Sequence, residues 1–478
     1  MNLAFQATRF AFPRLAAESV RRAHLIGIAG AGMQALAEVM LGQGWRLTGS
    51  DLSPQNSVWL SAAGVPVYAG HREEQVPANA DLVVYSDAVG PENAERRRAA
   101  ELGLRQLSYP AMLGELMAGR TGVAVAGTHG KSTTTALAGE ILREANLAPT
   151  IVGGAAPLGR NSGGCFGRGR HVLVEACEYR SNFLHLAPQV AVLLGIEHDH
   201  FDCFDSFADV ERAFFQFAQR VSGDGLILAH AGCPTALRVA KQAGRRVVTF
   251  GLGPAADWRA VALRSFRGRY AFRIVRRGQR VAEVKLAILG VYNVLNALAA
   301  AALAGELGVG RGAIERGLTR FAGLRRRMET RGSWREIVLL DDYAHHPTEI
   351  AASLKAVRER FPGRRVWCVF QPHQASRTRA LLDEFAASLH NADRVAVAEI
   401  FRAREAPGEY CDVTAAQLAE RLRMRGRPTL DVYGAEEIGE QLRAALAPGD
   451  VLITMGAGDI RKVGDGFIER LRTYRAAG

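Results

Sequence analysis

Residues 122–135 read GVAVAGTHGKSTTT, and this stretch decides the fold of the chain around it. A short apolar run, typical of a buried strand, leads into the turn GKS (130–132) and then into a helical pattern, ALAGEILREA (136–145). In such a turn the lysine neutralises phosphate charge and the hydroxyl binds Mg²⁺. The general pattern G-x-x-x-x-G-K-[ST] is not met, because Val125 stands where its first glycine should be. The stretch nevertheless predicts ATP binding by an α/β domain.

The segments on both sides repeat this alternation of short apolar runs and helical patterns. Such runs lie upstream at HLIGIA (24–29), WRLTGSD (45–51) and DLVVYS (81–86), and downstream at HVLVEA (171–176), VAVLLGI (190–196) and GLILAH (225–230). The alternation predicts parallel, doubly wound sheets. RYAFRIVRRGQRVAEVKLAI (269–288) differs, since its polar and apolar residues alternate around an RGQ turn. That pattern predicts an antiparallel hairpin.

The same rhythm resumes after RRRMETRG (325–332), in runs that end in polar or glycine residues. These runs are EIVLLDDY, VWCVFQPH, RVAVAEIF and VLITMGAG. We therefore predict three α/β domains: a Rossmann-like domain over residues 1–115 with an extension at 1–22, a central P-loop ATPase-like domain with a mainly parallel sheet over 116–325, and a second Rossmann-like domain over 326–478. Ligands of open α/β sheets bind beyond the carboxyl ends of the strands, so residues at these ends are candidate site residues.

Composition excludes several classes of protein. The 478 residues are 48% hydrophobic and 23% charged, which is typical of a globular protein rather than a disordered or membrane protein. No apolar run approaches the ~20 residues that span a bilayer, and the first 22 residues contain arginines without a sustained apolar core, which does not fit a secretory signal. The six cysteines are widely separated, which argues against a zinc ribbon or a disulfide framework and predicts a cytoplasmic protein.

The net charge of +12 has two interpretations. Nucleic-acid binding is one of them, but the arginines are scattered and are not interleaved with aromatic residues as a base-stacking surface requires. The other is a basic surface that attracts small anionic substrates such as nucleotides. We expect neither a nucleic-acid partner nor a membrane.

An earlier glycine turn, GIAGAGMQALA (27–37), also lies between a strand and a helix. This geometry lets the backbone approach a phosphate group, and Asp51 ends the next strand, where dinucleotide folds place a ribose-binding acid. Two interpretations remain open from these residues: nucleotide binding, or glycines that allow tight packing of strand and helix. Alone, the segment would suggest a nicotinamide oxidoreductase, but the lysine in the GKS turn argues against that class.

Several separated motifs resemble, in order, those of the Mur ligases, ATP-dependent amide-bond-forming enzymes of cell-wall precursor synthesis. The resemblance extends from about residue 23 over nearly the whole chain. The motifs are GIAGAGM, GTHGKSTTT, EACEY, IEHDHFD, NVLN, RRRM, DDYAHHPTE, FQPH followed by SRTR, and GAGDI. The agreement is greatest with the members that add the first amino acid.

The resemblance implies a reaction and its partners. ATP phosphorylates the lactyl carboxylate of UDP-N-acetylmuramate, and the amine of L-alanine attacks the acyl phosphate. Metal ions must cover the two anions that meet in the first step. Two Mg²⁺ ions are implied, with Mn²⁺ as an alternative, in a monomer or weak homodimer. The early glycine turn would then bind the UDP-sugar rather than NAD.

The resemblance also implies roles for individual residues. ATP contacts are implied at Gly127, Thr128, His129, Gly130, Lys131, Ser132, Thr133, Asn293 and Asn296. UDP-sugar contacts are implied at Gly27, Gly30, Gly32, Met33, Asp51 and Ser86. Metal ligands are implied at Ser132, Glu175 and His200, and catalytic roles at Lys131, His200, Arg326 and Arg327. Amino-acid contacts are implied at Tyr343, His345, His346, His373, Arg377 and Arg379.

Some positions depart from the family's pattern, and two alternatives stay open. Tyr292 replaces a histidine that precedes the two asparagines, and Cys177 replaces an aspartate within the EACEY run. We expect Cys177 to be a bystander, because its acidic neighbours raise the pKa of a thiol. The alternatives are a ligase that adds a recycled tripeptide, and a non-catalytic ATP- and UDP-sugar-binding regulator. The tandem histidines at 345–346 could indicate a further metal site, but the sequence shows no second cluster to support one.

Overall fold

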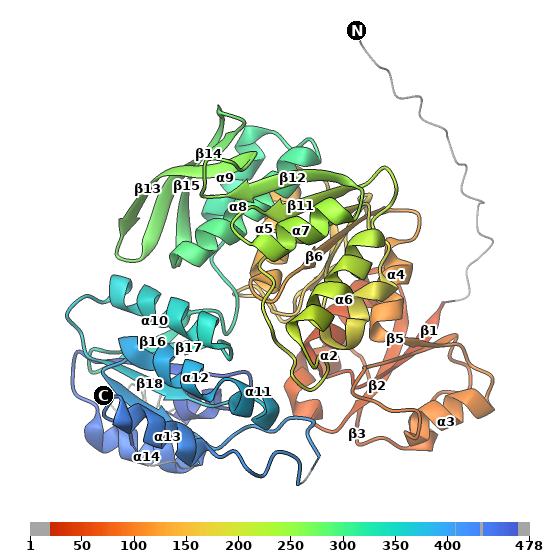
Figure 1. Cartoon of the computed structure of the whole chain (residues 1–478). Helices are drawn as coiled ribbons and strands as arrows, with labels where there is room; N and C mark the ends of the chain where they lie inside the picture. The colour runs from red at the N-terminus through yellow and green to blue at the C-terminus, as the bar shows by residue number, and fades with distance from the viewer. Residues whose placement is uncertain (1–19, 407, 431–433, 467–478) are drawn as a thin grey trace, which may run out of the picture.

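The computed structural model describes residues 20–406, 408–430 and 434–466, which form three α/β domains around three separate sheets (Figure 1). The three-domain α/β organisation predicted from the sequence is confirmed. Residues 1–19 of the predicted extension lie outside the described residues. Among the described residues, no helix has both the length and the apolar character needed to cross a bilayer.

The N-terminal domain is a parallel sheet with strand order β3-β2-β1-β4-β5. Its strands are β1 (Arg22–Ile26), β2 (Arg46–Asp51), β3 (Val67–Ala69), β4 (Leu82–Tyr85) and β5 (Gln106–Ser108), and its helices are α1 (Ala31–Gly42), α2 (Val58–Ala62), α3 (Ala94–Glu101) and α4 (Tyr109–Met117). Successive residues of a strand point to opposite faces. Leu25 therefore joins the core that contains α1, whereas Ile26 packs with Ala99 of α3. Because helices cover both faces of the sheet, successive residues such as Leu82, Val83 and Val84 of β4 are all buried.

The middle domain is built on a ten-stranded sheet with strand order β15-β14-β13-β12-β11-β10-β6-β9-β7-β8. Its strands are β6 (Thr121–Ala126), β7 (Thr150–Val152), β8 (Gly164–Cys165), β9 (His171–Glu175), β10 (Val190–Leu193), β11 (Leu226–His230), β12 (Arg246–Gly251), β13 (Trp258–Phe266), β14 (Arg269–Arg276) and β15 (Gln279–Leu289). Its helices are α5 (Lys131–Glu144), α6 (Phe207–Gln219), α7 (Pro234–Gln242), α8 (Val291–Glu306) and α9 (Arg311–Arg320).

Strand β6 runs through the interior of this sheet and leads into the phosphate-loop turn. Val123 and Val125 face α5, α8 and α9, whereas Ala124 and Ala126 face the core on the side of α6. The predicted hairpin is confirmed as β14 and β15, which pair antiparallel around Arg277 and Gly278. Both turn residues have positive φ, +46° and +85°, as a two-residue hairpin loop requires.

The C-terminal domain has the strand order β16-β17-β20-β18-β19, in which only β16 is antiparallel to its neighbour. Its strands are β16 (Glu329–Trp334), β17 (Ile337–Asp342), β18 (Val366–Phe370), β19 (Arg394–Val397) and β20 (Val451–Met455), and its helices are α10 (Pro347–Arg360), α11 (Ala375–Ala380), α12 (Leu382–Ser388), α13 (Ala415–Met424) and α14 (Ala435–Ala445). Cys368 faces the core under α10, α12 and α13, and Val369 faces that under α14.

The three domains are joined in different ways. The N-terminal and middle domains share one apolar core, in which α1 packs against β7 and β8 so closely that a Cβ on Gly164 would lie 2.2 Å from the Ala35 carbonyl oxygen. Glu38 of α1 also accepts a hydrogen bond from Arg160, at 2.8 Å. Figure 1 shows α10 on the side of the C-terminal domain that faces the middle domain. There Tyr270 donates a hydrogen bond to Glu359, at 3.0 Å.

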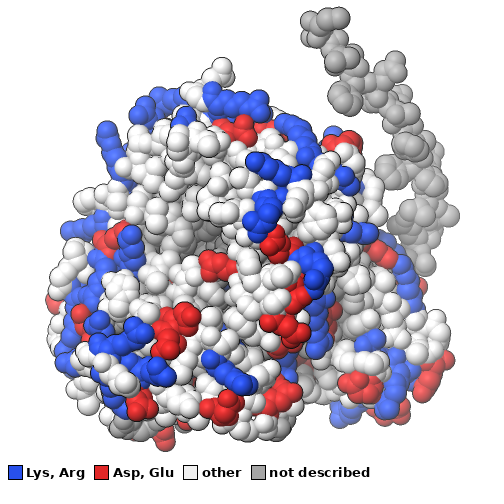
Figure 2. Space-filling view, viewed as in Figure 1, with Lys and Arg blue, Asp and Glu red and all other residues white. Residues whose placement is uncertain are grey.

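The charged side chains on the face drawn in Figure 2 are of both signs. Lysine and arginine side chains are interspersed with aspartate and glutamate there, and they do not form one continuous basic stripe (Figure 2). On this face the basic side chains are therefore spread over the surface. A spread of this kind fits attraction of small anions better than a nucleic-acid-binding track.

Candidate active site between the three domains

A cleft of about 870 Å³ lies where the three domains meet, a volume typical of sites that bind small molecules. The N-terminal domain contributes Gly30, Gly32, Met33, Ser86 and Tyr109, among others. The middle domain contributes Glu175, Cys177, Tyr179, Arg180 and Asn182, and the C-terminal domain contributes Tyr343, Arg404 and Glu405. A ligand in this cleft would contact all three domains at once.

The early glycine turn forms one wall of the cleft. Gly30 precedes α1 and Gly32 lies in its first turn, where a Cβ would come within 2.8 Å of the Tyr109 ring. Met33 and Ser86 also line this wall. Four of the six residues predicted to contact a UDP-sugar are thus brought together at the cleft.

The other two, Gly27 and Asp51, are not among the lining residues and hold the turn in place instead. Gly27 has a φ of +81°, and a Cβ there would lie 2.9 Å from the Cβ of Ser86. The Asp51 carboxylate accepts hydrogen bonds from the backbone N–H groups of Ala29 (2.9 Å) and Ser53 (2.8 Å). The tight-packing interpretation therefore applies to Gly27, whereas nucleotide binding by the turn residues that line the cleft stays a prediction.

The phosphate loop, Gly127 to Thr133, connects β6 to the first turn of α5. The Lys131 ammonium donates to the carbonyl oxygens of Gly127 (2.6 Å) and Thr128 (3.2 Å) and to the carboxylate of Glu178 (3.0 Å). Burial alone would lower the pKa of Lys131, but Glu178 more than offsets this and raises it. The lysine is therefore charged, and it lies at a helix N-terminus where a phosphate group would be favoured.

Glu178 is a site residue that the sequence interpretation did not select. Its side chain is only 3% exposed, and it lies between the Lys131 ammonium (2.9 Å) and the Nε2 atom of His200 (3.7 Å). Burial lowers the pKa of His200, and its Nδ1 atom is buried without a hydrogen-bond partner among the described residues. Glu178 thus positions both the lysine and the histidine that the motifs predicted.

Glu175 stands at the end of β9, as the motif predicted, and lines the cleft. Its carboxylate accepts a hydrogen bond from the N–H of Gly154, at 2.7 Å. Among the described residues, Glu175 and His200 do not form a cluster of closely spaced ligand atoms with a third His, Cys, Asp or Glu. Of the two glutamates in the EACEY run, Glu178 rather than Glu175 makes the ion-pair contact with His200.

Asn293 and Asn296 lie on α8 directly behind the phosphate loop. Asn296 donates to the side-chain oxygen of Asn293 (3.0 Å), and Asn293 donates to the Leu289 carbonyl oxygen (2.7 Å). A Cβ on Gly130 would lie 2.4 Å from the Asn296 side-chain oxygen, so this glycine permits the close approach of α8. In the structure the two buried asparagines position the loop.

The arginines at the start of the C-terminal domain surround Tyr343 of the cleft. The guanidinium groups of Arg326 and Arg327 lie 5.0 Å and 4.8 Å from the centre of its ring. Arg326 also donates to the carbonyl oxygens of Gly456 (2.6 Å) and Gly458 (3.1 Å), which ties it to the end of β20. The Arg327 side chain has no hydrogen bond or ion pair to another described residue, so it is the more available of the two cations.

A buried ion pair joins the C-terminal domain to the middle domain. Arg377 is 1% exposed and donates to the Asp199 carboxylate at 2.7 Å. Burial would raise the pKa of Asp199, but Arg377 more than offsets this and holds the pKa well below its usual range. Arg377 also donates to the His373 carbonyl oxygen, at 2.7 Å.

His373 and His345 lie next to this ion pair, with ring centres 5.6 Å apart. Burial lowers the pKa of His345 to about 4 and, together with His345 and Arg377, lowers that of His373 to about 2. Both imidazoles are therefore neutral at pH 7. Arg379, in contrast, is exposed and pairs with Asp412 at 3.2 Å, so it is not brought to this group.

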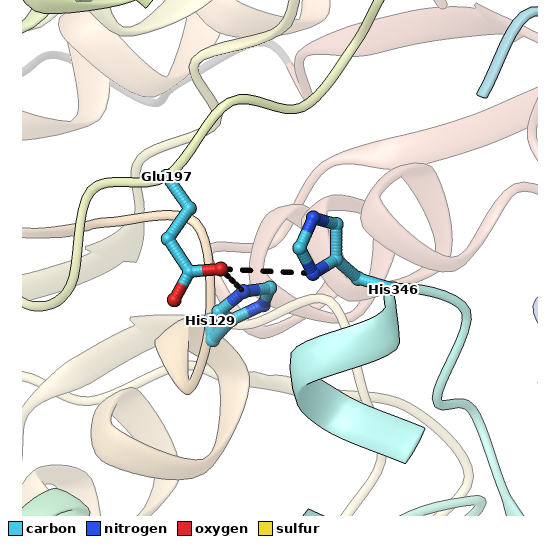
Figure 3. A group of neighbouring side chains, drawn as sticks. All are labelled: His129, Glu197 and His346. Carbon is cyan, nitrogen blue, oxygen red and sulfur yellow. Dashed lines mark hydrogen bonds and ion pairs between the residues drawn. The ribbon is translucent and has the colours of Figure 1, made fainter. Parts of the chain in front are cut away.

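The second of the tandem histidines turns toward the phosphate loop. His346 lies 3.7 Å from Glu197, which lies 3.4 Å from His129, so that three residues far apart in the sequence meet (Figure 3). His129 also contacts Glu349 of α10, at 3.1 Å. The expectation that no second cluster supports the tandem histidines is wrong, because folding brings the phosphate loop and the segment after β10 to them.

Comparison with known proteins agrees with this three-domain arrangement. The Mur ligase catalytic domain model of the family matches residues 22–121, the Mur ligase middle domain model matches 125–304, and the Mur ligase glutamate ligase domain model matches 326–458. UDP-N-acetylmuramate–L-alanine ligase of Salinibacter ruber is 41% identical over 455 residues, which are 95% of each chain. The chain belongs to the Mur ligase family.

Two solved structures of similar proteins superpose on this Mur ligase. A UDP-N-acetylmuramate–alanine ligase from Thermotoga maritima gives a TM-score of 0.80 at 25% identity, covering 95% of this chain and 99% of that one. A murein peptide ligase from Psychrobacter arcticus gives a TM-score of 0.71, also at 25% identity, covering 94% of this chain and 98% of that one.

Cys177 of this Mur ligase is exposed at the wall of the cleft and is not disulfide-bonded. The protein atoms that surround the thiol are the main cause of its raised pKa, and the Glu178 carboxylate is the second cause. The sequence predicted this direction. A neutral thiol beside two carboxylates is poorly suited to act as a nucleophile.

Two cleft arginines were not selected from the sequence. Among the described lining residues, the only cations are Arg180 and Arg404, and the Arg404 guanidinium lies 3.6 Å from the centre of the Tyr179 ring. Arg180 has a φ of +49°, a conformation uncommon for a residue other than glycine. Arg180 directly follows the EACEY run, whereas Arg404 lies in no recognised motif, so only the fold could reveal it.

The Arg377–Asp199 ion pair can be tested by removing its cation. We expect Arg377→Ala to destabilise the protein by about 3–5 kcal/mol, because Asp199 would stay buried without a partner. The matched control is Arg379→Ala, which removes an exposed arginine two residues away and should change stability by no more than about 0.5 kcal/mol. Thermal unfolding measures both variants. Equal melting temperatures for them would contradict a structural role for Arg377.

The His129 contact predicts a pH dependence of domain docking. Burial would lower the pKa of His129, but Glu197 and Glu349 raise it to about 9. Because this lies above the usual ~6.5, the stabilisation is complete below pH ~6.5 and is lost as the pH rises through about 9.

We therefore expect the protein without divalent cations to expand in small-angle X-ray scattering as the pH rises from about 6.5 to about 9.5. The groups that face His129 are Glu197, Glu349 and His346. Glu349→Gln should already be more open at the lower pH and should respond less to the change. A radius of gyration that stays constant in the unmodified protein would count against this contact.

Proposed function

We propose that this Mur ligase joins L-alanine to the lactyl carboxylate of UDP-N-acetylmuramate, using ATP, in the synthesis of peptidoglycan precursors. The observation that carries the proposal is the cleft between three domains, with a glycine turn on one wall and a carboxylate from the phosphate-loop domain on another. The similarity over the full chain to a UDP-N-acetylmuramate–L-alanine ligase supports the choice of substrates.

The phosphate loop is the proposed ATP site. An incoming phosphate oxygen would replace one of the two backbone carbonyl partners of Lys131, so that Glu178 stays paired with the ammonium. Asn293 and Asn296 would act from behind the loop. Tyr292 next to them keeps an aromatic face on which a base can stack.

The residues present fit a site for Mg²⁺. Ser132 offers a hydroxyl and Glu175 a carboxylate, the oxygen ligands that Mg²⁺ prefers, and His200 keeps a buried ring nitrogen without a partner among the described residues. We propose these three as the ligands, for two Mg²⁺ ions or for Mn²⁺, which imidazole also suits. The ions would reduce the repulsion between the attacking carboxylate and the γ-phosphate.

The UDP-sugar would occupy the cleft, with its diphosphate near the N-terminus of α1 and near Arg180 and Arg404. Its lactyl carboxylate oxygen attacks the γ-phosphorus, the bond to ADP breaks, and an acyl phosphate results. The amine of alanine then attacks the acyl carbon, loses a proton, and phosphate leaves.

We propose that the amino acid approaches from the C-terminal domain. Tyr343 reaches the cleft itself, and His345, His373 and Arg377 lie behind it in one group. Arg327, which stands beside Tyr343, would contact the phosphate that is transferred. Closure of the C-terminal domain would complete the site and exclude water from the acyl phosphate.

The substrates can be tested with an amino-acid panel. We expect phosphate release from ATP only when UDP-N-acetylmuramate and L-alanine are both present. Serine and glycine serve as close analogues, and the tripeptide L-alanyl-γ-D-glutamyl-meso-diaminopimelate serves as the competing substrate. If phosphate release requires the tripeptide, the protein adds a recycled tripeptide rather than alanine. If neither acceptor stimulates release, the ligase proposal is wrong.

The metal ligand can be tested within the EACEY run. Glu175→Ala should lower kcat by about 10²-fold or more, since it removes an interaction that stabilises charge in the transition state. Cys177→Ser is the matched control in the same cleft wall and should stay near the unmodified rate. Comparable losses of activity in both variants would mean that any change in this cleft wall lowers the rate, and that the Glu175 carboxylate has no particular role.

A further inference from the structure

We propose that His129, Glu197 and His346 form a binding site for a divalent transition-metal cation such as Zn²⁺, separate from the proposed Mg²⁺ ligands. These residues form the group shown in Figure 3, with one ligand atom from each lying within 4.8 Å of the others. The site would link the phosphate loop, the segment after β10 and the N-terminus of α10. It therefore spans the interface between the middle and C-terminal domains.

The spacing of the ligand atoms is close to that of a zinc site. Two ligands at the usual ~2.0–2.2 Å from a tetrahedral zinc ion lie about 3.3–3.5 Å from each other. Here the Oε2 atom of Glu197 lies 3.4 Å from Nε2 of His129 and 3.7 Å from Nδ1 of His346. A small rotation of the two rings would complete the triangle, and two imidazoles with one carboxylate are a ligand set typical of zinc rather than magnesium.

The groups behind the ligands support the same assignment. Nδ1 of His129 contacts the Glu349 carboxylate at 3.1 Å, which is the carboxylate–histidine arrangement that orients metal-binding imidazoles. The Glu197 carboxylate accepts a hydrogen bond from Thr348 at 2.7 Å, and its backbone N–H donates to Thr128 at 2.9 Å. Both ligands are therefore fixed by neighbours on either side of the interface.

Charge and access also fit a dication. Glu197 and Glu349 carry two negative charges, and the His129 imidazolium balances one of them. A divalent ion that displaces the proton from Nε2 of His129 would balance both. The Glu197 side chain is 41% exposed, so an ion and a completing water molecule can reach it from solvent. His346 accepts only a long hydrogen bond, 3.3 Å, from the N–H of Thr348, and burial lowers its pKa, so its neutral ring has a lone pair to offer.

Binding of Zn²⁺ to the full-length chain, without nucleotide, tests the proposal. Isothermal titration calorimetry should detect one Zn²⁺ at this site, and Co²⁺ in its place should give the intense visible absorption of a tetrahedral centre. Glu197→Gln and His346→Asn should each weaken Zn²⁺ binding by at least about tenfold. Asparagine is a good N-cap residue, so His346→Asn keeps an acceptor at the start of α10.

Three further variants distinguish Zn²⁺ binding at this site from Zn²⁺ binding elsewhere on the protein. Glu349→Gln should weaken Zn²⁺ by about tenfold, since it acts through His129. Glu175→Gln, at the proposed Mg²⁺ site, and His390→Asn, at an exposed histidine of the C-terminal domain, should leave Zn²⁺ affinity unchanged. If Glu175→Gln removes the Zn²⁺ while Glu197→Gln and His346→Asn retain it, or if the unmodified chain binds none, the proposal is wrong.

Discussion

The ion pair between Lys131 and Glu178 is the interaction on which the arrangement of the site depends. It joins the phosphate loop to the segment after β9, and that segment supplies much of the wall of the cleft. A buried cation and a buried anion tolerate separation poorly, because each would lose its partner in a medium of low polarity. The pair therefore fixes the position of the loop relative to the cleft, and His200 is placed by the same carboxylate.

The contacts of the C-terminal domain with the middle domain are mostly polar and follow one pattern. Arg377 meets Asp199, His129 meets Glu349, and Arg404 meets Asp202, each pair with one member from either domain. Pairs of this kind define orientation more than they add stability. Such pairs suit an interface that must open to admit three substrates and then close in a single relative orientation of the two domains.

Much of this arrangement could be predicted from the sequence, since apolar runs that lead into glycine or polar turns are local features. Short edge strands such as β3 and β8 were not predicted, because so few residues carry no periodicity. Glu178 lies within the EACEY motif but was not selected as a site residue, because its role depends on where folding brings Lys131 and His200. Arg404 and Asp199 acquire partners only through the packing of separate domains.

The two arginines of SRTR show how helix geometry separates neighbouring residues of one motif. They are two positions apart on α11, and residues at that spacing point to different sides of a helix. Arg377 is buried and Arg379 is exposed, so the motif could have supplied only one group to the site. The tandem histidines are separated in the same way as the two arginines: His345 joins the amino-acid group, whereas His346 faces the phosphate loop.

The shared apolar core of the N-terminal and middle domains has a consequence for how the chain unfolds. Separating these two domains would expose part of one continuous core to water, so they should melt as a single cooperative unit with a large heat-capacity change. The C-terminal domain has its own cores. It could detach in an earlier transition with a smaller change, leaving the glycine turn and the phosphate loop folded together.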